Sequence, residues 1–316
     1  MSRNPIGCWG VVFKAMSVPA VAIPGRFSIL ARVGAYVALT KPRIIELLLI
    51  TTLPTMILAQ AGMPAVWLMI ATLLGGTLAA GGANAINMYV DRDIDKLMHR
   101  TAKRPLVTGV IAPRNALIFA VTLEFVAFVE LWAWVNLLSA ALAVSATLFY
   151  VFIYTLWLKR TSKQNIVIGG AAGAMPVLVG WAAVTNSLAW TPIVLFAVIF
   201  TWTPPHFWAL AFKYKDDYEA ANVPMMPVVA TFRRTAFEIF VYTLIMVGFT
   251  LLLAPVAHLG ALYLVSAALL GIGFVAMSVR LWMQATPKAS MQLFSYSITY
   301  LTLLFIAMAV DVFIQR

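Results

Sequence analysis

The sequence predicts an all-α polytopic membrane protein, with about nine transmembrane helices around a central cavity and functional residues in cytoplasmic loops. Three observations predict this fold class. The 316 residues are 63% hydrophobic and only 10% charged, whereas a soluble domain carries roughly 25% charged residues. Long apolar runs recur along most of the chain with short polar breaks between them. The basic residues gather on alternate breaks.

Each apolar run is close to the roughly 20 residues that a helix needs to cross about 30 Å of hydrocarbon. We expect spans at approximately 44–62, 65–87, 115–135, 137–157, 165–184, 190–211, 235–254, 260–281 and 291–312. Strands of a membrane β-barrel are much shorter and alternate in polarity, which excludes a barrel. The single cysteine, Cys8, excludes an intrachain disulfide and a cysteine-based metal site.

The basic residues predict the orientation of these spans. Every Lys and Arg except Arg316 falls on one side of the membrane, and the breaks near 63, 136, 187 and 257 contain none. Because basic loops stay in the cytoplasm, we expect a cytoplasmic N-terminus and cytoplasmic charged loops. The net charge of +11 then reflects topology, and no nucleic-acid partner is expected.

The N-terminal region differs from the rest of the chain. Residues 1–40 contain no acidic residue and lack a continuous apolar stretch with a cleavage site. They are predicted to form a cytoplasmic or interfacial tail, and residues 41–316 the transmembrane domain. A bacterial inner membrane is the expected location. The alternative is that the tail is a short transit sequence to the mitochondrial inner membrane.

Small residues crowd two of the predicted spans. Gly169 and Gly173 in the fifth span are four residues apart, a spacing that lets transmembrane helices approach closely. Tight helix packing is the favoured interpretation, and the lining of a cavity for a flat or long substrate is the alternative.

Four oxygen-bearing side chains align where the second span leaves the membrane. At about 100° per residue they fall within a wedge of roughly 80°, whereas Asp93 falls on the opposite side of the helix. These four residues are Asn84, Asn87, Asp91 and Asp95. Carboxylate and amide oxygens in a row suit Mg2+, which proteins hold with one or two carboxylates plus substrate phosphates. The alternative, charges that only solvate a loop, does not explain a shared face.

Basic residues and a second acidic cluster accompany this array on the same side. Arg100, Lys103 and Arg104 follow it and could neutralise phosphate oxygens. The second cluster contains Asp216 and Asp217, in a loop whose prolines prevent a long helix. Together the two clusters predict a site for a diphosphate and a metal ion.

The stretch from Asn84 to Leu106 resembles the first aspartate-rich motif of the UbiA-type intramembrane prenyltransferases. Within that superfamily the chain looks most like the branch that farnesylates heme B, the heme O synthases. This likeness rests on Tyr89–Asp95, Asn165–Gly170, Trp202–Trp208, Tyr214–Tyr218 and Asn222–Pro227. It extends from about Lys41 to the C-terminus. One departure is that Ala220 and Ala221 stand where many relatives complete a second D-x3-D motif.

The resemblance implies nine helices, Mg2+ as the cofactor, farnesyl diphosphate as the donor and heme B as the acceptor. It implies heme O, made with addition of water, as the product for terminal oxidase assembly. A downstream heme A synthase is then an expected partner, along with the lipid bilayer. The implied catalytic and metal-binding residues are Asn87, Asp91, Asp95, Asp216 and Asp217. The implied substrate-binding residues are Asn84, Arg100, Lys103, Arg104, Arg160, Lys163, His206, Lys213 and Tyr218.

Several alternatives stay open. His206 is predicted either to ligate or position heme or to be a hydrogen-bonded residue near a helix end. Glu124 and Glu130 lie within the third span, where a carboxylate is a functional candidate by default. The acceptor could instead be an aromatic quinone precursor such as 4-hydroxybenzoate. A transporter with an ion-coupling carboxylate is a further alternative, although such sites lie near the midplane of the membrane.

Overall fold

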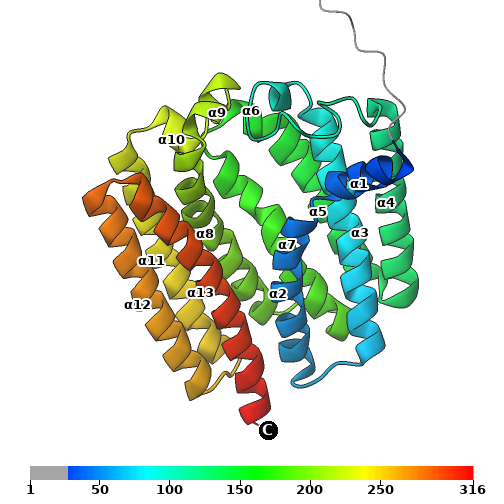
Figure 1. Cartoon of the computed structure of the whole chain (residues 1–316). Helices are drawn as coiled ribbons and strands as arrows, with labels where there is room; N and C mark the ends of the chain where they lie inside the picture. The colour runs from blue at the N-terminus through cyan, green and yellow to red at the C-terminus, as the bar shows by residue number, and fades with distance from the viewer. Residues whose placement is uncertain (1–27, 316) are drawn as a thin grey trace, which may run out of the picture.

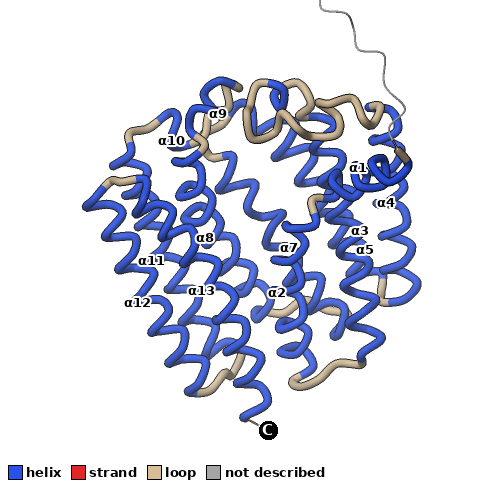
Figure 2. Tube along the Cα trace, viewed as in Figure 1, coloured by secondary structure: helices blue, strands red, loops and turns tan. Residues whose placement is uncertain are grey.

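Long helices lie side by side through the part of the chain that the structure describes (Figure 1). This computed structural model describes residues 28–315, and for residues 43–49 it describes the backbone alone. Figure 2 shows helices and loops but no strand among the described residues. Cys8 and the basic residues Arg3, Lys14, Arg26 and Arg316 lie outside them.

Eight helices of the described residues are long and apolar enough to cross a membrane, which confirms the predicted fold class. They are α3 (Val66–Val90), α4 (Pro113–Trp134), the continuous helix Leu137–Thr161, α7 (Asn165–Thr185), α8 (Trp190–Lys213), α11 (Phe232–Val256), α12 (Ala261–Gln284) and α13 (Pro287–Ile314). These helices match the last eight predicted spans to within a few residues. The first predicted span, 44–62, coincides with α2 (Pro42–Gln60).

The fourth span contains a feature that the sequence did not predict. Its first part is α5 (Leu137–Leu148), its second is the π-helix η2 (Phe149–Leu158), and a last turn forms α6 (Lys159–Thr161). The Thr155 hydroxyl donates to the Tyr150 carbonyl, five residues earlier, at 2.8 Å. π-Helical segments are rare and are found frequently at functional sites.

The core centres on α8, which packs against α7, α11 and α13. The large side chains Trp202 of α8, Phe274 of α12 and Tyr300 of α13 are fully buried there. The short helix α1 (Ile29–Thr40) lies across the long helices in Figure 1. Part of the predicted N-terminal tail is therefore helical, and Leu39 in this helix is buried against α3 and α4.

The glycines of α7 allow close helix packing, which was the favoured interpretation. A Cβ atom at Gly169 would collide with the ring of Tyr154 in η2, and one at Gly170 would lie 2.9 Å from Thr203 in α8. Gly173 differs, because a Cβ atom there would meet nothing within 4 Å. Two of these three glycines therefore bring α7 against its neighbours.

The short elements gather at one end of the bundle, shown uppermost in Figure 1. They are η1 (Ile94–Lys96), α6, α9 (Lys215–Ala220) and α10 (Met226–Val229). The two short helices α9 and α10 confirm that the prolines of this loop prevent a long one. The C-terminus lies at the opposite end. The loops 91–112 and 214–231, which carry the clustered charges, lie at the same end as the short elements.

A buried carboxylate at that opposite end joins the last two helices. Asp311 of α13 is 1% exposed, and its two oxygens accept from the Gly260 and Tyr263 amides, at 2.6 and 3.1 Å. Gly260 is the N-cap of α12 and Tyr263 lies in its first turn, and amides at these positions have no acceptor within the helix. Gln315 also donates to this carboxylate. Asp311 therefore links the C-terminal end of α13 to the N-terminal end of α12. The sequence did not predict this role.

We expect Asp311→Ala to destabilise the α12–α13 hairpin by about 1–3 kcal/mol, because it leaves the buried Tyr263 amide and the partly buried Gly260 amide without an acceptor. Asp311→Asn keeps one oxygen acceptor and should have a smaller effect. Thermal unfolding of the purified variants in detergent measures the difference. An Asp311→Ala protein that melts at the wild-type temperature would contradict this role.

Candidate active site

The predicted array lies where α3 ends. The helix stops at Val90, so it does not continue through Asp95 as the projection assumed. Helix-like spacing persists nevertheless, because the Asp91 amide donates to the Asn87 carbonyl and the Asp95 amide to the Asp91 carbonyl, each at 2.9 Å. The four array residues are 0–5% exposed, whereas the Asp93 side chain is 60% exposed. The structure thus places Asp93 apart from the array, as the spacing predicted.

Each buried aspartate has one oxygen on a cation. Asp91 Oδ2 is paired with Lys159 of α6, and Asp95 Oδ2 is paired with Arg104 at 2.6 Å. Asp91 Oδ1 and Asp95 Oδ1 are buried and have no hydrogen-bond partner. The Arg160 guanidinium lies 3.8 Å from Asp91 Oδ1, beyond hydrogen-bond distance. One free carboxylate oxygen on each aspartate therefore remains for a ligand.

Asn87 connects this pair to two other elements. Its Nδ2 donates to Asp91 Oδ2 at 2.8 Å and to the hydroxyl of Thr155 in η2 at 3.2 Å. Its Oδ1 accepts from Lys41 Nζ at 2.9 Å. Asn84 donates to the Thr40 carbonyl at 3.1 Å, at the end of α1. The amides therefore fix α3 against η2 and against the α1–α2 junction.

Lys41 is a third basic side chain at the site. It forms the junction of α1 and α2 in the left-handed conformation, with φ of 52°, and this turn carries its amine to Asn87. Burial is the main reason that the pKa of Lys41 falls to about 7, and the positive charges of Arg104 and Lys159 add to it. Three basic side chains from separate elements therefore lie close together beside the aspartates.

Arg160 lies beside the site, with its guanidinium 3.8 Å from Asp91 Oδ1, but its hydrogen bonds go to other groups. Its guanidinium donates to both Asp93 oxygens at 2.7 Å and to the Val90 carbonyl at 3.2 Å. The hydrogen bond from Arg160 is the main reason that the pKa of Asp93 falls to about 2. Arg160 of α6 therefore binds the C-terminal end of α3 and the residue Asp93 that follows it. Lys103 and Lys163 are exposed.

The second acidic cluster contacts the loop that follows the array. Asp217 of α9 accepts from the amides of His99 at 3.0 Å and Arg100 at 3.2 Å, using both oxygens. The Arg100 guanidinium donates to the Tyr218 hydroxyl at 3.2 Å and lies over the Tyr214 ring. These contacts hold α9 against the 97–104 segment, which carries Arg104.

Asp216 and Lys213 are exposed, with Lys213 Nζ 5.6 Å from the centre of the Tyr214 ring. Within the described residues, no three His, Cys, Asp or Glu side chains gather as a possible metal site. The two acidic clusters therefore adjoin through the backbone of residues 99–100, and their carboxylates do not form one metal-binding group.

The comparisons with known proteins place this geometry in a family. The sequence profile of the UbiA prenyltransferase family matches residues 48–308. The chain belongs to the UbiA prenyltransferase family. It is therefore a prenyltransferase, and the transporter alternative is set aside.

Two similar relatives are named protoheme IX farnesyltransferase. The protein from Renibacterium salmoninarum is 51% identical over 296 residues, which cover 92% of this chain and 93% of the relative. The protein from Streptomyces avermitilis is 52% identical over 297 residues, which cover 90% and 95%.

Solved structures share the fold of this UbiA-family chain. Digeranylgeranylglyceryl phosphate synthase has a TM-score of 0.74 at 16% identity, over 89% of this chain and 98% of that one. A UbiA homologue from Archaeoglobus fulgidus bound to GPP and Mg2+ has a TM-score of 0.63 at 17% identity, over 88% and 99%. These likenesses concern the fold alone.

His206 is engaged in the core of this UbiA-family bundle. Its Nδ1 lies 2.7 Å from the Ser297 hydroxyl of α13, and its ring stacks on Trp202 at 4.2 Å. Phe294 contacts the same ring at 4.7 Å. His206 is therefore hydrogen-bonded through Nδ1, as one of the two alternatives predicted. A role of its ring in heme binding stays a prediction.

The two carboxylates of α4 pack on glycines of α3. Glu124 accepts from the Thr147 hydroxyl of α5 at 3.2 Å, and a Cβ atom at Gly82 would lie 2.7 Å from it. Glu130 packs in the same way on Gly75, and its Oε2 is buried without a hydrogen-bond partner. Thr147 is thus the partner of Glu124 that sequence reasoning did not find.

Sequence reasoning also missed three polar residues of the site: Lys41, Thr155 and Lys159. Lys41 and Lys159 were counted only as topology charges, although each adjoins the end of a long apolar run. That position was the available signal, because a charge at a helix end can turn toward a polar site inside the bundle. Thr155 gave no signal, since its contact with Asn87 depends on the π-helix.

We expect Asp217→Ala to loosen the segment 97–101, because the His99 and Arg100 amides lose their acceptor. Hydrogen bonds to a charged group contribute about 1.5–3 kcal/mol, so amide exchange there should accelerate about tenfold or more. Exchange measured by mass spectrometry tests this. Asp216→Ala, on the exposed neighbour, is the matched control and should leave exchange unchanged; equal effects of the two variants would contradict the assignment.

Proposed function

We propose that this chain transfers a farnesyl group from farnesyl diphosphate to a vinyl group of heme B and makes heme O. The observation that carries the proposal is the 51% identity, over nearly the whole chain, with a protein named protoheme IX farnesyltransferase. The buried carboxylates of Asp91 and Asp95 also support it, because a prenyl transfer needs a site for a metal ion and a diphosphate.

The donor would bind at this pair through its diphosphate. The free oxygens Asp91 Oδ1 and Asp95 Oδ1 fit a divalent cation, because they are hard, buried and without partners. Asn87 Oδ1 accepts from Lys41 Nζ at 2.9 Å, and it would complete the set by exchanging that contact for the metal ion. Mg2+ bound there supplies neutralisation of the diphosphate charge and Lewis-acid activation of the leaving group. A role for Asp216 or Asp217 in a second metal site stays a proposal.

The basic residues would act on the same leaving group. Lys41, Lys159 and Arg104 already lie around the two aspartates, so they can contact diphosphate oxygens without a large rearrangement. Cations that are positioned before the reaction stabilise charge as it develops on the departing oxygen. The allylic C–O bond then breaks and inorganic diphosphate leaves.

The acceptor would supply the electrons for the new bond. The terminal carbon of a heme vinyl group attacks the farnesyl carbon, and the positive charge moves to the vinyl carbon next to the pyrrole. Water adds to that carbon and releases a proton, which leaves a hydroxyethylfarnesyl substituent. The apolar bundle must exclude water from the first cation, because an early water would convert the donor to farnesol.

We also propose the setting of this reaction. The charged loops would be cytoplasmic, in the inner membrane of a bacterium, and the product would pass to a heme A synthase for terminal oxidase assembly. Basic loops at one end of the bundle support the orientation. In a Cys8→Ser background, Ser187→Cys should react with an impermeant thiol reagent from outside, and Thr108→Cys only after permeabilisation. The reverse pattern would reject this topology.

Membranes that contain the protein should convert heme B and farnesyl diphosphate to a heme of increased mass when Mg2+ is present. Chelation of Mg2+ should abolish the product. Mass analysis of the extracted heme, in parallel with 4-hydroxybenzoate as acceptor, measures the choice of acceptor. Prenylation of the phenol without prenylation of heme would end the heme proposal and leave a prenyltransferase of quinone precursors.

Asp91→Ala should lower turnover by at least about 100-fold. Loss of a residue that only supports a metal ligand lowers activity by about 10- to 100-fold, and Asp91 is proposed to be a ligand itself. Asp93→Ala is the matched control on the same turn. It should keep turnover within about fivefold, since an exposed ion pair contributes at most about 1 kcal/mol. Both are assayed after confirming insertion and the melting temperature. An active Asp91→Ala enzyme would reject the proposed site.

A further inference from the structure

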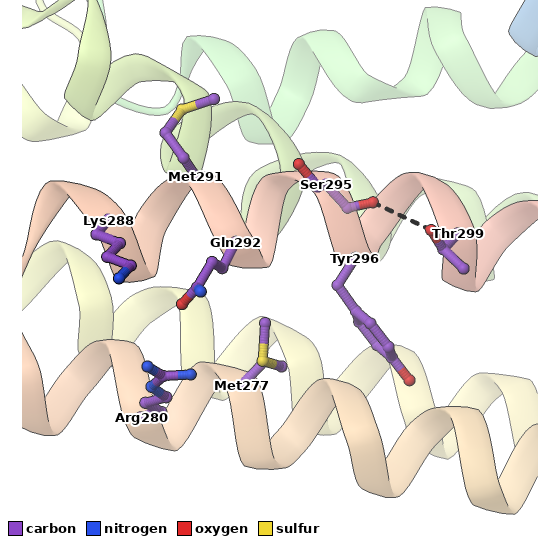
Figure 3. Close-up of a pocket in the computed structure, with 8 residues that line it drawn as sticks. All are labelled: Met277, Arg280, Lys288, Met291, Gln292, Ser295, Tyr296 and Thr299. Carbon is purple, nitrogen blue, oxygen red and sulfur yellow. Dashed lines mark hydrogen bonds between the residues drawn. The ribbon is translucent and has the colours of Figure 1, made fainter.

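A crevice of about 540 Å3 opens between α12 and α13, away from the Asp91 site (Figure 3). Met277 and Arg280 line it from α12, and residues of α13 between Lys288 and Thr299 line it from the other side. The turn that joins the two helices lies at the end of the bundle that carries the charged loops. The crevice therefore runs from that end along the outside of the bundle.

The entrance of the crevice is positively charged. Figure 3 shows Arg280 and Lys288 together at one end, with Tyr296 and Thr299 at the other. No carboxylate lines the crevice, and neither cation forms an ion pair with a carboxylate of the described residues. Arg280 Nε donates only to the neutral Gln284, at 3.2 Å. The entrance thus offers two cations to an anion.

An unused acceptor lies further into the crevice. Gln292 Oε1 is buried and has no hydrogen-bond partner. In Figure 3 its amide lies between the two helices, beyond Lys288. A buried carbonyl oxygen without a donor is uncommon in proteins. The positive-inside distribution of basic residues accounts for Arg280 and Lys288, but it does not account for this acceptor.

The end of the crevice away from the two cations is lined by the Tyr296 ring and by the hydroxyl-bearing side chains of Ser295 and Thr299. The Tyr296 hydroxyl donates to the Leu270 carbonyl at 2.9 Å, which fixes the ring across α12. This ring packs on Gly273, where a side chain would displace it. Leu269 and Ile272, on the same helix, are about two thirds exposed, as expected for residues in contact with acyl chains.

We propose that this crevice binds one anionic phospholipid whose head group carries a hydroxyl, as in phosphatidylglycerol. The phosphate would lie between Arg280 and Lys288, and the head-group hydroxyl would donate to Gln292 Oε1. One acyl chain would follow Met277 and the Tyr296 ring along the membrane-facing side. The proposal goes beyond the prenyl transfer and uses none of the residues assigned to it.

Native mass spectrometry of the full chain in detergent tests the proposal. Wild-type protein should bind one phosphatidylglycerol much more tightly than phosphatidylcholine with the same acyl chains. The variant R280Q/K288Q should bind phosphatidylglycerol roughly thirtyfold more weakly, from about 1 kcal/mol for each cation near an anionic lipid. R233Q removes an exposed cation at the start of α11 and is the matched control; it should bind like wild type.

The hydroxyl contact has its own test. Phosphatidylmethanol has the same charge but no head-group hydroxyl, so wild type should prefer phosphatidylglycerol over it and Q292L should lose that preference. Unfolding temperatures confirm that each variant is folded. Equal binding of phosphatidylglycerol and phosphatidylcholine, or wild-type binding by R280Q/K288Q, would overturn the site. Displacement of the lipid by farnesyl diphosphate would also overturn it, because the crevice would then bind the prenyl donor.

Discussion

Asp91 and Asp95 are two carboxylates without exposed surface at the end of a transmembrane helix. A buried charge costs several kcal/mol unless it is paired, so both aspartates require cations close by. Lys159 and Arg104 provide them, from α6 and from the loop after η1. This one requirement therefore joins three separate elements. Each of these two cations contacts a single oxygen, and the other oxygen of each aspartate has no hydrogen-bond partner.

The π-helix and the second acidic loop serve the same arrangement. In η2 the backbone brings Thr155 to the amide of Asn87, and the chain then continues directly into Lys159. On the other side, Asp217 holds the segment that leads to Arg104. In this structure Asp217 therefore supports the segment that carries Arg104. The proposed chemistry needs positioned charge and dry surroundings, and both follow from how these elements pack.

Most of the fold could be predicted because lipid leaves few choices: a spanning segment must be a long apolar helix. The array could be predicted because the period of a helix fixes which side chains share a face, and this placed Asp93 apart. The rest depended on contacts between distant parts of the chain. Lys41 reaches Asn87 through a left-handed turn, and Arg160 turned to Asp93. No local pattern specifies either contact.

The free oxygens of Asp91 and Asp95 are proposed to hold a divalent cation. Mn2+ can replace Mg2+ as a probe visible to electron paramagnetic resonance, and farnesyl thiolodiphosphate can occupy the donor site without reacting. With this analogue present, wild type and Asp93→Ala should bind Mn2+ alike, and Asp91→Ala and Asp95→Ala should lose the bound signal. Wild-type Mn2+ affinity in a folded Asp91→Ala, Asp95→Ala double variant would contradict the account.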